Sequence, residues 1–138
     1  MTGETENREA AWTDEKLSET AHGYWESLAL MSAVHLGLFD ALADGPLADA
    51  DLALKLGASL RGTSMLAEAM AAMGLVRRSA DGVSSLTEFS FSRLTSSSPR
   101  SVRGLVEHMR RLLAEWTVLD RAVLEGSLPR REKTPERR

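Results

Sequence analysis

Apolar residues recur every three or four positions across residues 14–43, which predicts amphipathic helices over this part of the chain. Thr13 or the residue after it can cap the first turn, because short polar side chains accept hydrogen bonds from free helical N–H groups. Gly23 and Gly37 divide the stretch into two or three helices. The turn at residues 44–46 ends it, since proline cannot continue a helix.

Two shorter helical patterns and a hairpin follow this turn. Residues 49–56 and 60–73 each have helical spacing, and two helices joined by a few residues form a helix-turn-helix. Residues 75–79 and 83–87 predict two strands, because Asp-Gly at the turn between them supplies the positive φ angles of a hairpin. This order predicts a mainly α fold, a winged helix-turn-helix with a small β-hairpin wing and extra N- and C-terminal helices.

The last periodic segment covers residues 101–125, where Ser101 can cap the helix and Gly126 can end it. An interruption is expected near Ala114. The pattern of residues 87–93 fits a strand or a helical turn equally well, so both assignments stay open here.

The two ends of the chain lack periodicity. Residues 1–13 are expected to form a flexible arm. Residues 129–138 are charged, include two prolines and offer almost nothing to bury, so they are expected to be a linker toward a missing catalytic domain. The predicted winged-helix domain therefore covers residues 14–128.

Composition narrows the functional classes. The chain has 138 residues, enough for one domain. It has no cysteine, so disulfides and thiolate-bound zinc are excluded, and no cluster of metal ligands or catalytic triad is visible. No apolar run reaches the roughly 18 residues of a membrane span, and no apolar leader is present. We expect a cytoplasmic protein that does not associate with a membrane, binds no metal and has no catalytic residue of its own.

The charge is distributed unevenly along the chain. Residues 1–60 carry eleven acids and three bases, whereas residues 61–138 carry nine acids and fourteen bases. Arginines on solvated helix faces explain this, and nucleic-acid binding is the alternative. The second helix of the helix-turn-helix offers one Arg, one acid and small apolar residues, so DNA contact is not expected. Arg77 and Arg78 keep a winged-helix transcriptional regulator as the alternative function.

Four stretches carry a family resemblance. They read AVHLGLFDAL with DGP at 33–42 and 44–46, MAAMGLV at 70–76, SSPRSVRG at 97–104 and WTVLDRAVLEG at 116–126. In this order they resemble the N-terminal dimerisation domain of the plant-type and bacterial S-adenosyl-methionine-dependent O-methyltransferases. That family includes caffeic acid O-methyltransferase, hydroxyneurosporene methyltransferase and enzymes that act on polyketides.

The resemblance implies an intertwined homodimer that forms part of the pocket for a small aromatic or polyketide-like substrate. In the family, a following doubly wound domain binds S-adenosyl-methionine, and the chain contains no glycine-rich G-x-G-x-x-G loop for it. We therefore expect no cofactor site in this chain. It is expected to be a fragment of a longer enzyme, and a stand-alone domain that pairs with a separate methyltransferase is the alternative.

Long apolar stripes on residues 24–42 and 105–123 exceed what one small domain can cover, which predicts a dimer. His35 is expected in the core or in this interface rather than in catalysis. The resemblance places the substrate beside the last helix, although ordinary core packing is the alternative for the same side chains. The substrate-pocket candidates are Met109, Leu113 and Trp116. The dimer-interface candidates are Tyr24, Trp25, Leu28, Met31, His35 and Leu38.

Overall fold

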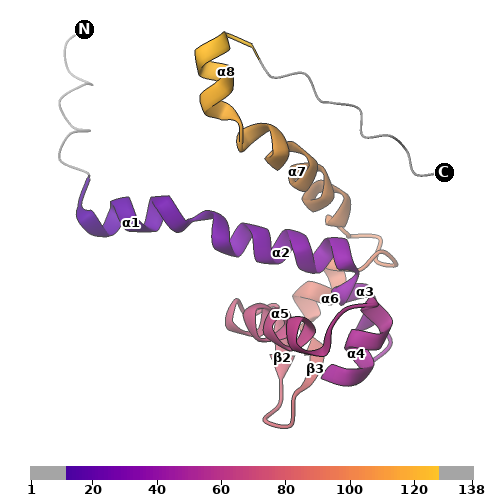
Figure 1. Ribbon diagram of the computed structural model, residues 1–138. Helices are drawn as coiled ribbons and strands as arrows, with labels where there is room; N and C mark the ends of the chain where they lie inside the picture. The colour runs from indigo at the N-terminus through magenta and orange to yellow at the C-terminus, as the bar shows by residue number, and fades with distance from the viewer. Residues whose placement is uncertain (1–11, 128–138) are drawn as a thin grey trace, which may run out of the picture.

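The computed structural model describes residues 12–127 of the chain (Figure 1). Most of the predicted N-terminal arm and all of the predicted linker at 129–138 lie outside the described residues. The described part is mainly helical, with one small three-stranded antiparallel sheet. None of its helices is long and apolar enough to cross a membrane.

The N-terminal stretch forms three helices, as the glycine positions predict: α1 (Asp14–His22), α2 (Tyr24–Leu36) and α3 (Leu38–Ala41). The Thr13 hydroxyl accepts a hydrogen bond from the Lys16 N–H at 3.1 Å, which confirms the predicted cap. Gly37 has a φ of 83°, a left-handed conformation that glycine adopts without strain. The chain therefore changes direction between α2 and α3.

The middle of the chain contains α4 (Asp49–Leu56), α5 (Leu60–Ala72) and the hairpin of β2 (Val76–Arg78) and β3 (Val83–Leu86). These elements lie where the pattern predicts them. A strand that the pattern does not predict, β1 (Leu47–Ala48), pairs antiparallel with β3, so the strand order is β1-β3-β2. This strand was not predicted because two residues are too few to show the alternation of apolar and polar positions that marks a strand.

The ambiguous segment after the hairpin is a helix, α6 (Glu88–Leu94), which Thr87 caps by accepting a hydrogen bond from the Ser90 N–H. The C-terminal pattern forms α7 (Arg103–Trp116) and α8 (Leu119–Glu125). Helix α7 begins two residues after Ser101, whose hydroxyl accepts from the Arg103 N–H. The interruption falls at 117–118, a few residues beyond the predicted position.

The core lies among α2 to α6 and the sheet. Its largest fully buried apolar side chains are Phe39, Leu38, Leu52, Met70 and Val34. By contrast, α1, α7 and α8 contribute no buried residue. Figure 1 shows why: α1 with the start of α2 and α7 with α8 extend from the packed part as two diverging arms.

Candidate dimer interface and substrate groove

The first arm, defined as residues 12–28, presents large apolar side chains to solvent. Trp25 on α2 is 61% exposed, and Leu17 on α1 is 60% exposed. Acidic residues occupy the first turn of both helices, where their negative charge interacts favourably with the positive end of the helix dipole. The exposed apolar residues of this arm are Trp12, Leu17, Tyr24, Trp25 and Leu28.

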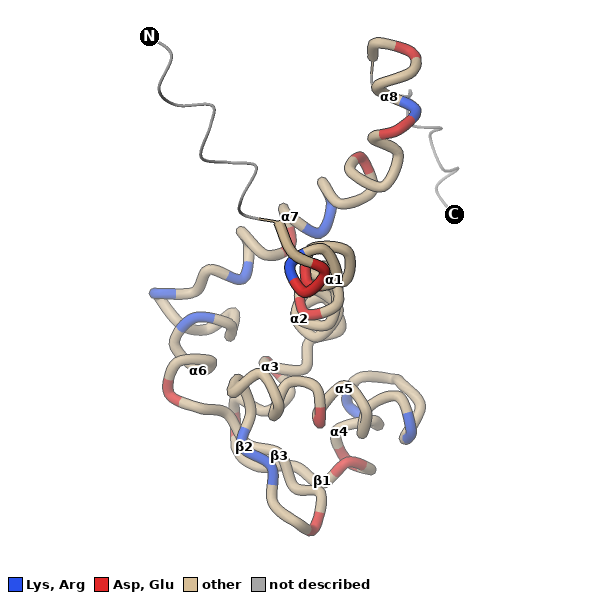
Figure 2. Tube along the Cα trace, turned by 90° about the vertical axis from the view of Figure 1, so that its left-hand side faces the viewer, with Lys and Arg blue, Asp and Glu red and all other residues tan. Residues whose placement is uncertain are grey.

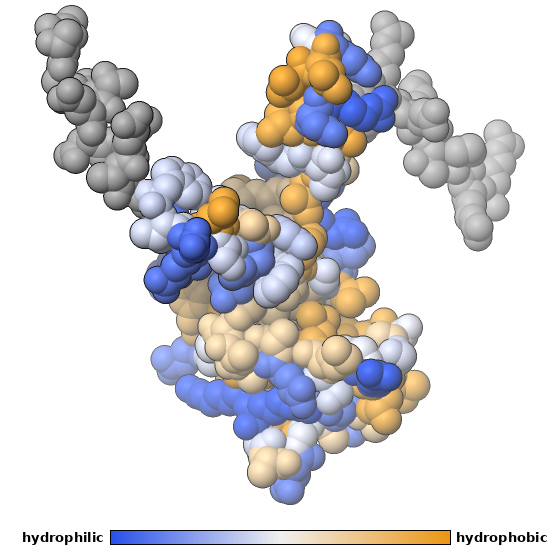
Figure 3. All heavy atoms as spheres, turned by 60° about the vertical axis from the view of Figure 1, so that its left-hand side comes forward, coloured by the Kyte–Doolittle hydropathy of each residue, from blue (hydrophilic) through white to orange (hydrophobic). Residues whose placement is uncertain are grey.

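The second arm, defined as α7 and α8, has the same character. Trp116 is 66% exposed and Leu124 is 84% exposed, and Figure 3 shows apolar side chains on the surface of this raised arm. The exposed apolar residues are Leu105, Met109, Trp116, Leu119, Val123 and Leu124. Contiguous apolar surface of this kind usually marks an interaction site in a globular protein.

One interface candidate is wrong. Leu38 is 0% exposed and belongs to the core of the chain itself, so a partner cannot reach it. The error arises at Gly37, whose left-handed backbone gives α3 a different direction from α2, so the stripe of α2 does not continue to Leu38. Met31 is partly buried, whereas Tyr24, Trp25 and Leu28 remain exposed.

Polar contacts hold the first half of α7 against the packed part of the molecule. His35 on α2 lies 3.3 Å from Glu107, measured from Nδ1 to Oε2. The Arg103 guanidinium lies 3.6 Å from the Asp40 carboxylate, which also accepts a hydrogen bond from the Ser96 N–H at 2.7 Å. These contacts fix where α7 starts, so the second arm projects from a defined base.

A groove lies between the two arms. It has a volume of about 440 Å³, and the α2–α7 groove is lined by Leu28, Ser32, Arg110, Arg111, Leu113, Ala114 and Thr117. Of the three substrate-pocket candidates, only Leu113 lines it. Met109 and Trp116 are exposed and are not among its lining residues.

Two other hollows lie elsewhere on the surface. One of about 610 Å³ is lined by His35, Arg103 and Glu107 together with small residues, and its charged side chains are the ones that already pair. The other, of about 350 Å³, lies where the turn after α3 meets β3 and α6. Neither contains a substrate-pocket candidate.

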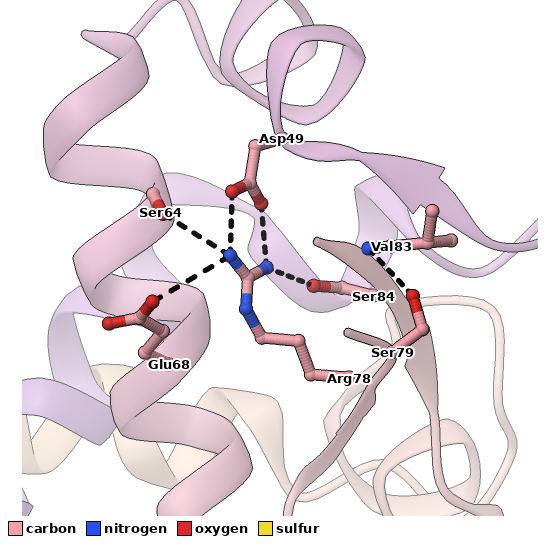
Figure 4. A network of polar contacts seen from close by, with 7 residues as sticks. All are labelled: Asp49, Ser64, Glu68, Arg78, Ser79, Val83 and Ser84. Atoms are coloured by element: carbon pink, nitrogen blue, oxygen red, sulfur yellow. Dashed lines mark hydrogen bonds and ion pairs between the residues drawn. The ribbon is translucent and has the colours of Figure 1, made fainter. Parts of the chain in front are cut away.

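A separate polar network ties the hairpin to α4 and α5 (Figure 4). The Arg78 guanidinium donates two hydrogen bonds to the Asp49 carboxylate, at 2.7 and 2.6 Å. It also donates to the hydroxyls of Ser84 on β3 and Ser64 on α5. This bidentate bond to Arg78 holds the pKa of Asp49 below its usual value, and the same contact raises the pKa of Arg78.

This network removes Arg78 from the surface that could meet DNA. Its side chain is only 13% exposed, because it contacts Ser84 on β3 and Asp49 at the start of α4; Figure 2 shows the basic residues of β2 in blue and the acidic start of α4 in red. Arg77 remains exposed, and Glu68 on α5 lies 4.0 Å from Arg78. The alternative of a transcriptional regulator therefore loses one of the two basic residues that motivated it.

The chain belongs to the O-methyltransferase dimerisation domain family, whose pattern it matches over residues 18–97. Acetylserotonin O-methyltransferase of Rattus norvegicus is 36% identical over 111 residues, which are 80% of this chain and 26% of that enzyme. The chain therefore spans about a quarter of the length of this relative.

Solved structures agree with this assignment to the family. Human N-acetylserotonin methyltransferase, determined in complex with SAM, superposes with a TM-score of 0.72 at 32% identity, over 90% of this chain and 36% of that one. The structure of PigF with SAH gives a TM-score of 0.75 at 30% identity, over 83% of this chain and 38% of that one. Both similarities extend through most of the described elements.

Residues 12–127 do not fit the cofactor of these enzymes. A nucleotide-type cofactor needs a parallel strand, a glycine-rich turn and the N-terminus of the next helix. In the described part the sheet is antiparallel throughout, and β3 leads to α6 through Thr87 without a glycine.

Sequence reasoning missed two features of these surfaces. Asp49 and Arg78 are 29 positions apart, and no local pattern reports such a pair. Arg110 and Ser32 line the α2–α7 groove, and they were missed because the prediction followed apolar residues only. The spacing of Arg110, Leu113, Ala114 and Thr117 at i, i+3, i+4 and i+7 is the signal that could have located this face of α7.

Proposed function

We propose that the chain forms an intertwined homodimer through its two arms and supplies a wall of the substrate pocket in an S-adenosyl-methionine-dependent O-methyltransferase. In this proposal residues 14–128 are the dimerisation domain, built as a winged helix in which α4, α5 and the β2–β3 hairpin pack together. Residues 129–138 are the linker to the domain that binds the cofactor. The enzyme acts in the cytoplasm on a small aromatic or polyketide-like substrate.

The exposed apolar surface of the arms is the observation that carries this proposal. Three helices of the described chain, α1, α7 and α8, bury no residue, yet they carry Trp116 and several exposed leucines. Covering apolar area stabilises an assembly by about 25 cal/mol per Å². A second copy covers both arms at once when two molecules pair around a twofold axis, because each presents the same surfaces.

The α2–α7 groove supports the second half of the proposal. Leu28, an interface candidate, and Leu113, a substrate-pocket candidate, line the same groove. A partner that packs against the exposed part of α2 therefore comes close to this groove. Such a groove, open in one copy, becomes an enclosed pocket when the second copy packs over the arms, as pockets at interfaces commonly do.

Light scattering after size-exclusion chromatography tests the dimer directly. We expect the 138-residue chain to elute with twice its own mass of 15.1 kDa at micromolar concentration. Trp25→Glu places a charge in the proposed interface and should give a monomer. Leu54→Glu is the matched control, because Leu54 is 82% exposed on α4, away from both arms, and should leave the dimer intact. A monomeric unmodified chain would contradict the proposal.

A further inference from the structure

We propose that the α2–α7 groove selects an aromatic carboxylate, with Arg110 as the residue that recognises the negative charge. This inference rests on the proposed function, because it names the class of molecule that the substrate pocket takes. It adds a specificity-determining residue to a surface that sequence reasoning treated as apolar.

One face of α7 builds the groove. Arg110, Leu113, Ala114 and Thr117 follow one another at helical spacing, and Leu28 and Ser32 are one turn apart on α2. The leucines provide an apolar surface for a flat ring. Ala114 adds only a methyl group to the lining. The volume of about 440 Å³ lies in the range of small-molecule sites.

The charge of the groove is positive. Two arginines line it and no Asp or Glu does, although the whole chain has a net charge of −3. Arg111 already interacts within the chain, as does Glu115 one turn further along α7. Glu107, the other acid of α7, contacts His35. No acid of the groove lining therefore competes with an incoming anion.

Arg110 is the available donor. Within residues 12–127 its guanidinium makes no hydrogen bond or ion pair, in contrast to Arg78 and Arg103. Guanidinium binds a carboxylate through two parallel hydrogen bonds, which fixes the orientation of the ligand. A ring on Leu28 and Leu113 with its carboxylate at Arg110 satisfies both the apolar and the charged part of the groove.

Neutral aromatic molecules fit the apolar part only. They gain the contact with the leucines but leave the guanidinium in water, so they bind without preference for the residue at position 110. A helix of a second copy in the groove is a different occupant, and the experiment separates it from the small ligand.

The test compares 2-naphthoate with its neutral analogue 2-naphthamide by NMR titration of the 138-residue chain. We expect naphthoate to shift the signals of Leu28, Leu113 and Ala114 with a Kd on the order of 1 mM, a typical value for a fragment-sized ligand. Arg110→Gln should weaken naphthoate binding about tenfold and leave naphthamide unchanged. Arg121→Gln on α8 removes the same charge outside the groove lining and should change neither.

Three outcomes would each overturn the inference. The two ligands could bind equally well, or the Arg110→Gln variant could bind naphthoate as the unmodified chain does. The groove signals could also report contacts between two copies and respond to neither ligand. Light scattering on the same samples distinguishes the two proposals. A dimer that does not discriminate the ligands contradicts only the assignment of Arg110, whereas a monomer contradicts the proposed function.

Discussion

Buried hydroxyl groups show how differently single residues are satisfied in this fold. Ser84, Ser90 and Thr95 are 0% exposed, and each has a hydrogen-bond partner. Thr63 in the first turns of α5 is 2% exposed, and its hydroxyl oxygen has no partner among the described residues. An unpaired buried hydroxyl is destabilising, because it leaves its hydrogen bonds to water unreplaced.

Replacing Thr63 by valine should therefore stabilise the fold. Valine keeps the shape of threonine and removes the unpaired oxygen, so we expect the free energy of unfolding to rise by about 1 kcal/mol. Thr95→Val is the matched control, because the Thr95 hydroxyl donates to the Phe91 carbonyl at 2.6 Å and its loss should destabilise by a similar amount. Urea unfolding followed by circular dichroism measures both. Equal effects of the two substitutions would contradict this account of Thr63.

The Asp49–Arg78 pair makes stability depend on pH in the acid range. The hydrogen bonds from Arg78 hold the pKa of the Asp49 carboxyl below its usual value in the folded chain, so the charged form of Asp49 favours folding. This stabilisation is complete above the unfolded pKa of about 3.9 and is lost as the pH falls through the lower folded value. We expect Asp49→Asn to destabilise by about 2 kcal/mol at neutral pH, because Arg78 loses its partner.

Acid unfolding curves provide the check. Between neutral pH and the acid range, the stability difference between the unmodified chain and Asp49→Asn should shrink as Asp49 becomes protonated. Asp51→Asn is a suitable control, since Asp51 is exposed on the same helix. A difference that stays constant down to the lowest accessible pH would show that the carboxylate charge does not stabilise the fold.

At the scale of elements, glycines decide where helices end. Gly37 has a φ of 83° between α2 and α3, and Gly104 lies inside the first turn of α7, where an added Cβ meets no atom within 4 Å. Gly37→Ala should destabilise by about 1 to 2 kcal/mol, because alanine is strained in a left-handed conformation. Gly104→Ala should stabilise by roughly 0.5 kcal/mol. Thermal unfolding measures the stability of both variants. The two effects must have opposite signs, so that Gly37→Ala lowers the stability and Gly104→Ala raises it.

Most helices could be predicted because their apolar residues repeat with the helical period, whether or not the fold buries them. The hairpin followed from the Asp-Gly turn at residues 81–82. Two features escaped for physical reasons. Strand β1 has two residues and exists only because β3 pairs with it. Residues 117–118 separate α7 from α8 without a proline or a glycine, so no turn residue marks the break.

The site was predicted less completely than the fold. A stripe of apolar residues identifies a face that avoids water, but it does not tell whether the chain itself or a partner covers that face. Leu38 is covered by the core, whereas Met109 and Trp116 remain exposed. Only the tertiary structure tells which side chains the chain itself covers. For Leu38 the answer depends on the direction that Gly37 gives to the following helix.

At the scale of the whole molecule, residues 12–127 form a packed part and two arms whose apolar side chains this part leaves exposed. If a second copy covers them, folding and association are coupled, and stability depends on protein concentration. A monomeric domain has a melting temperature that is independent of concentration. This difference makes thermal unfolding a test of the assembly that does not depend on measuring its mass.

We expect the melting temperature of the chain to rise with concentration. Each tenfold increase adds about 1.4 kcal/mol to the stability of a dimer that dissociates on unfolding, which corresponds to roughly 3 to 6 °C for a domain of this size. Met109→Glu removes an exposed apolar side chain from the second arm and should abolish this dependence. Met65→Glu, on α5, is matched in residue type and exposure, at 59% against 48%, and should preserve it. If both variants melt with the same concentration dependence as the unmodified chain, α7 does not belong to the interface.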